Sequence, residues 1–96
     1  MPIYVQFTTF TEEGRKIIKE RVKGESKESN KALEEMGIKI LAQYSLLGQY
    51  DMVNILEAPS KEVVMKEAME INHRNIVTTL TMPAIPISDL RDALKE

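Results

Sequence analysis

The residues most able to do chemistry are few, and they fall in two short segments. Tyr50 and Asp51 end a Gly-x-Tyr-Asp string, and His73 and Arg74 follow an amphipathic stretch. An acid, the chain's one histidine and an arginine could form an acid–base site or bind a small anion. A histidine after a helix is also often a cation that stabilises the helix C-terminus, so both interpretations stay open.

Pro2 points to a different chemistry. Removal of Met1 would leave a secondary amine at the N-terminus, and Met1-Pro2-Ile3 resembles the start of the 4-oxalocrotonate tautomerase family, in which an N-terminal proline is the base. This resemblance ends after the first predicted strand, and proline is also ordinary as the first residue of a strand. A tautomerase-like enzyme that uses Pro2 is therefore the alternative function.

Composition argues against several other classes. The chain has no cysteine and one histidine, too few for a typical transition-metal site, and it has no Gly-rich phosphate loop, so we expect neither metal nor cofactor. Its 13 basic and 15 acidic residues are interleaved, which argues against nucleic-acid binding. No apolar run approaches the roughly 18 residues that a membrane span needs, so we expect a cytoplasmic protein without membrane contact.

The elements that position these residues follow from hydrophobic periodicity. Alternating apolar residues and turn signals predict four strands at 3–10, 38–47, 50–57 and 76–82. Helical spacing follows Thr11 and Ser60, a stretch without apolar residues predicts a break near Gly24, and a short helix ends the chain. The order β-α-β-β-α-β predicts one ferredoxin-like α+β domain over 1–96, with a four-stranded antiparallel sheet and helices on one face.

The first strand suggests what happens at the other face of the sheet. Its odd-numbered residues from Ile3 to Phe7 are apolar, and we expect the helices to cover them. The even-numbered residues from Tyr4 to Thr8 would then lie on a bare face that a second copy of the chain covers, giving a homodimer or a larger homo-oligomer. A partly polar pocket is expected between the two sheets, lined by Gln6, Thr8 and whichever of Gln43, Asn54 and Thr79 point inward.

The hairpin carries a resemblance. Residues 46–59 read LLGQYDMVNILEAP, which is similar to the signature of the GYD-domain family, named for a Gly-x-Tyr-Asp turn that enters a strand. The opening strand, Gly14 and Gly37 extend the match over nearly the whole chain. The resemblance implies a dimeric α/β barrel, in which two sheets pack face to face, and it supplies no substrate and no catalytic residue. Similar turns occur in the ligand-binding domains of leucine-responsive regulators, which share this architecture.

These observations together favour a homo-oligomeric module that binds a small molecule or regulates a partner. Candidate ligand-binding residues are the polar side chains of the first strand, of the hairpin with its third strand, and of the end of the second helix: Tyr4, Gln6, Thr8, Tyr50, Asp51, Asn54, His73 and Arg74. No residue is assigned a catalytic role.

Overall fold

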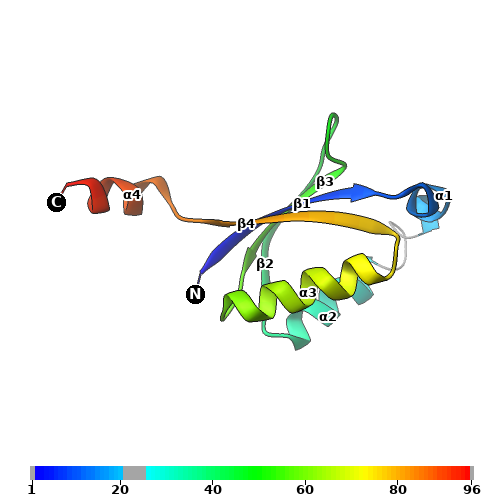
Figure 1. Ribbon diagram of the computed structural model, residues 1–96, viewed down its shortest axis with the longest axis horizontal. Helices are drawn as coiled ribbons and strands as arrows, with labels where there is room; N and C mark the ends of the chain where they lie inside the picture. Colours follow the sequence, from blue (N-terminus) through cyan, green and yellow to red (C-terminus); the bar gives the residue numbers. More distant parts are fainter. Residues whose placement is uncertain (1, 21–25, 96) are drawn as a thin grey trace.

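The computed structural model describes residues 2–20 and 26–95, whose strands form a four-stranded antiparallel sheet in the order β2-β3-β1-β4. The elements along the chain are β1 (Ile3–Phe10), α1 (Glu12–Glu20), α2 (Ser26–Glu35), β2 (Lys39–Ser45), β3 (Met52–Glu57), α3 (Lys61–His73), β4 (Val77–Ala84) and α4 (Ile87–Leu94) (Figure 1). The predicted α+β class and antiparallel sheet are confirmed. The break expected near Gly24 lies outside the described residues.

Local hydrogen bonds explain where the helices begin and end. The Gly14 N–H donates to Thr11 Oγ1 at 3.0 Å, and the Val63 N–H donates to Ser60 Oγ at 3.3 Å, so both predicted N-caps are present. Gly37, with φ +82°, follows α2 in the left-handed conformation that glycine favours. The connection between β2 and β3 is longer than the two-residue turn expected, because β2 ends at Ser45 and β3 begins at Met52.

The fourth strand runs further than expected. The sequence pattern predicts a strand that ends at residue 82, yet β4 continues to Ala84, and Pro83 pairs with Tyr4. β4 is an edge strand, and there a proline can leave its missing N–H on the solvent side without breaking the ladder.

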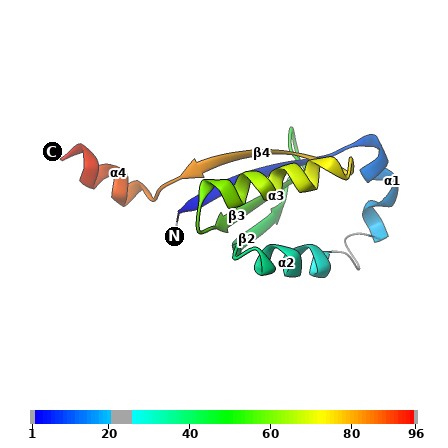
Figure 2. The same cartoon turned by 60° about the horizontal axis from the view of Figure 1, so that its bottom comes forward.

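The two faces of the sheet are the reverse of those predicted. Helices α2 and α3 lie on one face (Figure 2), and on that side Tyr4, Gln6 and Thr8 are buried. Tyr4 joins the core with Leu56, Ile38, Val64, Leu33 and Ala58. Ile3, Val5 and Phe7 are only half-buried, on the face that these helices leave uncovered. The expectation that Tyr4, Gln6 and Thr8 occupy the bare face is therefore wrong. Under the helices Tyr4 packs in the apolar core, and the Gln6 amide donates to Glu67 and Thr81.

The last helix stands apart from the rest of the molecule. Figures 1 and 2 both show α4 extending beyond the end of β4, away from the helices that cover the sheet. The molecule measures 51 × 30 × 20 Å, and its radius of gyration is 14.6 Å, above the roughly 12–13 Å usual for a chain of this length. The described part of the chain holds no helix that is both long and apolar enough to cross a membrane.

Candidate functional site

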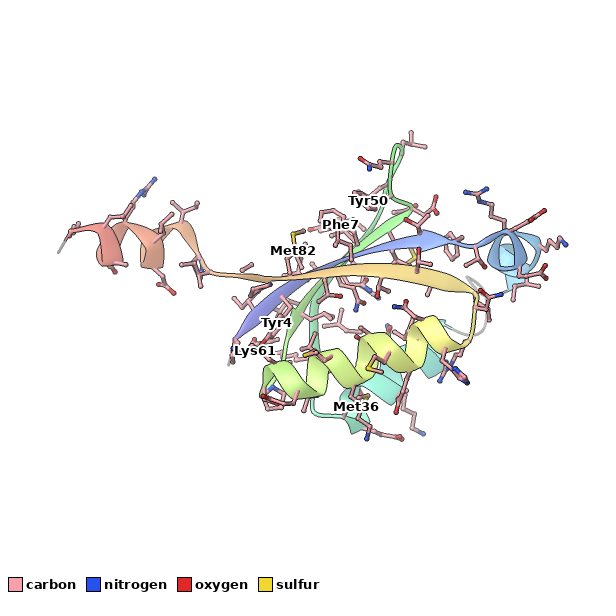
Figure 3. All side chains as sticks on the ribbon, viewed as in Figure 1. Tyr4, Phe7, Met36, Tyr50, Lys61 and Met82 are labelled. Carbon is pink, nitrogen blue, oxygen red and sulfur yellow. The ribbon has the colours of Figure 1, made fainter. Side chains whose placement is uncertain are left out.

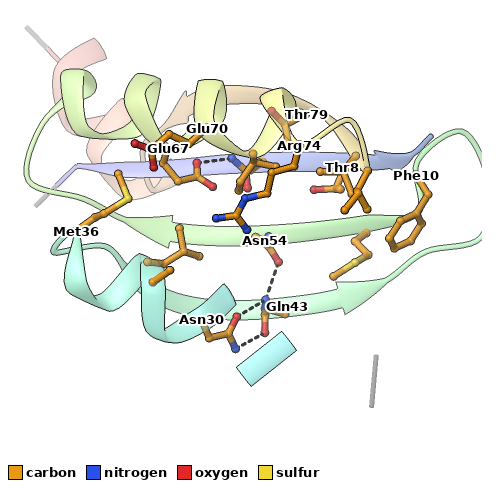
Figure 4. A pocket seen from close by; sticks show the side chains of 17 residues that line it. Thr8, Phe10, Asn30, Met36, Gln43, Asn54, Glu67, Glu70, Arg74 and Thr79 are labelled. Atoms are coloured by element: carbon orange, nitrogen blue, oxygen red, sulfur yellow. Dashed lines mark hydrogen bonds between the residues drawn. The ribbon is translucent and has the colours of Figure 1, made fainter. Parts of the chain in front are cut away.

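A cavity of about 180 Å³ lies between the sheet and helices α2 and α3 (Figure 4). Its apolar wall comes from the helices and the strand ends, and includes Leu33, Met36, Met52, Ile71 and Val77. Its polar lining comes from all four strands and both helices: Gln6, Thr8, Asn30, Gln43, Asn54, Glu67, Glu70, Arg74 and Thr79. A small cavity with an apolar wall and a few convergent polar groups is typical of a small-molecule site.

Glu67 is the most unusual residue of this cavity. It lies on α3 and is only 1% exposed. Gln6 Nε2 donates to Glu67 Oε2 at 2.9 Å and to Thr81 Oγ1 at 3.2 Å, which fixes the orientation of the Gln6 amide. Glu67 Oε1, in contrast, is buried and has no hydrogen-bond partner among the residues that the structure describes. Leaving such an atom unpaired is costly, so native proteins rarely do it without a reason.

The described lining of the cavity holds two acids and one base. Burial raises the pKa of Glu67; the hydrogen bond from Gln6 acts against this rise, and the nearby Glu70 carboxylate adds to it. Arg74 follows α3 and supplies the single positive charge among the lining residues that the structure describes. In the close view its side chain extends into the space between α3 and the sheet (Figure 4).

Side-chain amides continue the polar lining toward β2. Gln43 Nε2 donates to Asn54 Oδ1 at 3.1 Å, and Gln43 exchanges two longer hydrogen bonds with Asn30, at 3.3 and 3.4 Å. These contacts join α2, β2 and β3 at one end of the cavity (Figure 4). Amide groups can donate as well as accept, so this end can meet either kind of ligand atom.

Four of the predicted site residues line the cavity, and four do not. Gln6, Thr8, Asn54 and Arg74 come together there, although on the helix side of the sheet rather than between two sheets. Gln43 and Thr79, expected between the sheets as well, also line it. Tyr4 lies deeper in the core, and Tyr50, Asp51 and His73 lie outside the cavity.

Tyr50 and Asp51 anchor the hairpin. Asp51 Oδ2 accepts a hydrogen bond of 2.8 Å from the Phe10 N–H, and the Asp51 N–H donates to the Thr8 carbonyl at 2.9 Å. The Tyr50 ring packs on Phe7, with 4.7 Å between ring centroids. Both residues thus tie the hairpin to β1, a structural role of the kind expected of a turn.

His73 and Pro2 lie away from the cavity. His73 is the exposed last residue of α3, and among the described residues no hydrogen bond or ion pair joins it to Asp51. Pro2 is exposed just before β1, and its carbonyl oxygen accepts from the Ala58 N–H at 3.0 Å. Neither residue is among those that line the cavity. Residues 2–20 and 26–95 contain no group of three or more histidine, aspartate and glutamate side chains placed so that it could hold a metal ion.

Glu67 is not among the site residues predicted from the sequence, although its position in the sequence carries a signal. Val64, Ala68 and Ile71 mark the apolar stripe of the helix, and Glu67 follows Val64 by three residues on the same stripe. A carboxylate on an apolar stripe is buried when the helix packs, and burying it without hydrogen-bond or charged partners costs free energy. Its placement therefore could have marked it as a candidate site residue.

A second candidate surface is the uncovered face of the sheet. The strand register places the following apolar residues on it: Ile3, Val5, Phe7, Ala42, Tyr44, Val53, Ile55, Leu80, Met82 and Ala84. The same register places Thr9, Lys39, Glu57 and Thr78 at the two ends of this face. Figure 3 shows Phe7, Tyr50 and Met82 on the side of the sheet away from α3, and Tyr4 on the same side as α3. Leu80 is 45% exposed and Tyr44 61% exposed. Contiguous apolar surfaces of this kind mark interaction sites on soluble proteins.

Comparison with known proteins agrees with this architecture. A family model described as GYD domain matches residues 4–94. The "Glutamine synthetase and cystathionine beta-lyase binding protein" of Thermus thermophilus is 36% identical over 99 residues, an alignment that spans 99% of this chain and 100% of that protein. The crystal structure of FFRP-DM1 superposes with a TM-score of 0.56 and 20% identity, over 88% of this chain and 100% of that one, which supports the fold.

Proposed function

The chain belongs to the GYD domain family. We propose that it is a homo-oligomeric binding module that regulates other proteins. The uncovered sheet face is the observation that carries the proposal. On one side of the sheet the helices bury the core, while the other side presents ten apolar residues, with Thr9, Lys39, Glu57 and Thr78 only at its two ends. A face this apolar is costly to leave in water.

A second copy of the chain is the occupant that we propose for this face. A two-fold axis would place each sheet against its own copy, the commonest closed arrangement of a homo-oligomer. The face is also uniform enough in composition to pair with itself, since its centre at Phe7, Val53 and Leu80 is apolar on all three strands. Burial of these side chains would stabilise the pair by removing apolar surface from water.

Helix α4 extends the same apolar surface beyond the sheet. On β4, Leu80, Met82 and Ala84 point to the uncovered face, and the chain then continues through Ile85 into α4. Ile87 and Leu94 of α4 are 61% and 75% exposed. Because the helix follows directly from the proposed interface, we propose that it packs on the second copy rather than on its own chain.

The regulatory part of the proposal comes from the relative. That protein is named for binding glutamine synthetase and cystathionine β-lyase, and it aligns with this chain from end to end. Self-association through the sheet leaves the helix side of each copy free to contact such an enzyme. A dimer also presents two copies of that side, which raises the avidity for an enzyme with repeated subunits.

We therefore expect this protein to bind purified glutamine synthetase or cystathionine β-lyase from its own source. Biolayer interferometry with the enzyme immobilised should give saturable binding. Immobilised serum albumin, an unrelated acidic protein, is the control for non-specific binding. A variant that no longer dimerises should bind at least about 10-fold more weakly, because its avidity is lost. The absence of saturable binding to both enzymes would overturn the regulatory part of the proposal.

A further inference from the structure

We propose that the cavity between the sheet and helices α2 and α3 binds a small molecule with a primary ammonium group, which donates to Glu67 Oε1. The inference rests on the proposed function in that it names the ligand class of a binding module. It does not depend on the dimer, because one chain supplies every residue that lines the cavity.

The unpaired oxygen of Glu67 is the first argument. Glu67 is 1% exposed, and its Oε2 already accepts from Gln6 Nε2 at 2.9 Å. Its Oε1 is buried without a hydrogen-bond partner in the described part of the chain, although it belongs to a side chain that lines the cavity. A donor brought by a ligand would satisfy this atom, and a hydrogen bond to a charged group is among the stronger ones in proteins.

The charge of the cavity lining indicates which kind of hydrogen-bond donor the ligand carries. Among the described lining residues the carboxyl groups of Glu67 and Glu70 stand against one guanidinium, that of Arg74. With both carboxyl groups ionised, these residues carry one negative charge in excess. A carboxylate or phosphate ligand would bring a further negative charge beside the buried Glu67 and would be repelled. An ammonium group supplies both the missing donor and the balancing charge.

Size and surroundings limit the rest of the ligand. The cavity volume is about 180 Å³, and an engineered cavity of about 150 Å³ is known to hold benzene, so a ligand of roughly six to eight non-hydrogen atoms fits. Leu33, Met36 and Ile71 give its body an apolar wall. Gln43 and Arg74 are exposed residues of the same lining, which gives the cavity a route to solvent. A short aliphatic primary amine meets these conditions.

Three probes with the same carbon chain test the proposal. Butylamine, 1-butanol and butyrate are titrated separately into the unmodified protein at neutral pH, and the side-chain amide signals of Gln6 are followed by ¹H–¹⁵N NMR. Butylamine should shift these signals saturably in the millimolar range or below, with a dissociation constant at least about 10-fold lower than that of 1-butanol. Butyrate should leave the signals unchanged.

A pair of variants on α3 then assigns the contact. Glu67→Gln should remove the preference for the amine over the alcohol, whereas Glu62→Gln, an exposed acid at the start of the same helix, should keep it. Equal binding of amine and alcohol, binding of butyrate, retention of the preference in Glu67→Gln, or no saturable shift with butylamine would each overturn the inference. If butylamine fails while the protein still binds glutamine synthetase, only the ligand assignment is lost. If butylamine binds and neither enzyme does, the regulatory proposal is lost and the ligand site stands.

Discussion

Replacing Leu80 with glutamate is expected to separate the proposed oligomer into folded single chains. Leu80 lies on β4, opposite Phe7 on β1, and is 45% exposed on the uncovered sheet face. In a two-fold dimer each interface would bury two such glutamates without partners, at a cost of about 1–3 kcal/mol each. The dimer dissociation constant should therefore rise by at least about 30-fold. Size-exclusion chromatography with light scattering at micromolar concentration measures this change directly.

A matched substitution on the opposite side of the molecule controls for the added charge. Met65 lies on α3 and is 64% exposed, so Met65→Glu adds the same charge without touching the sheet face. This variant should keep the mass of the unmodified protein, and circular dichroism should show both variants folded. An oligomer that survives Leu80→Glu, or that dissociates with Met65→Glu, would show that the interface lies elsewhere.

Replacing Glu67 with glutamine is expected to stabilise the protein at neutral pH. The wild-type side chain is buried with one oxygen unpaired among the described residues, and glutamine keeps its shape while removing the charge. Relief of an unsatisfied buried charge is worth about 1–3 kcal/mol, which in a domain of this size raises Tm by at least about 4 °C. Thermal denaturation at a fixed protein concentration measures the shift.

The same substitution should remove a dependence of stability on pH. Burial raises the pKa of Glu67 above its ordinary value of 4.5, although the hydrogen bond from Gln6 opposes this and Glu70 adds to it. Since the folded protein then holds this proton more tightly than the unfolded chain, wild-type stability falls as pH rises from 4.5 to the raised pKa. The advantage of Glu67→Gln should be full above that pKa and vanish below 4.5. An advantage that grows toward acid pH would contradict the assignment.

The order of elements could be predicted from the sequence because each has a local cause. Thr11 and Ser60 cap their helices, and Gly37 ends α2, so these boundaries depend on residues close in the chain. Which face of the sheet the helices cover could not be predicted in the same way. The apolar residues Ile3, Val5 and Phe7 fit a core, and only the tertiary structure shows them opposite the helices. An apolar face of a strand indicates burial and does not say whether a helix or a partner covers it.

Only part of the candidate site could be predicted from the sequence, because some of its contacts depend on tertiary packing. Gln6, Thr8 and Asn54 share one face of the sheet by alternation and register, so they lie together whichever layer covers them. Glu67 comes from a helix 61 residues further along the chain than Gln6, and their contact depends on how α3 packs on the sheet. No local pattern specifies that packing, and for this reason the buried carboxylate became apparent only in the structure.

The native mass of the unmodified protein is the most direct test of the proposed homo-oligomeric module. The chain mass is 11.0 kDa, and the uncovered sheet face predicts that light scattering at micromolar concentration reports at least twice that value. The mass should stay at or above this value on dilution through the low micromolar range, because the buried surface is apolar. A single species of 11.0 kDa across that range would contradict the proposal.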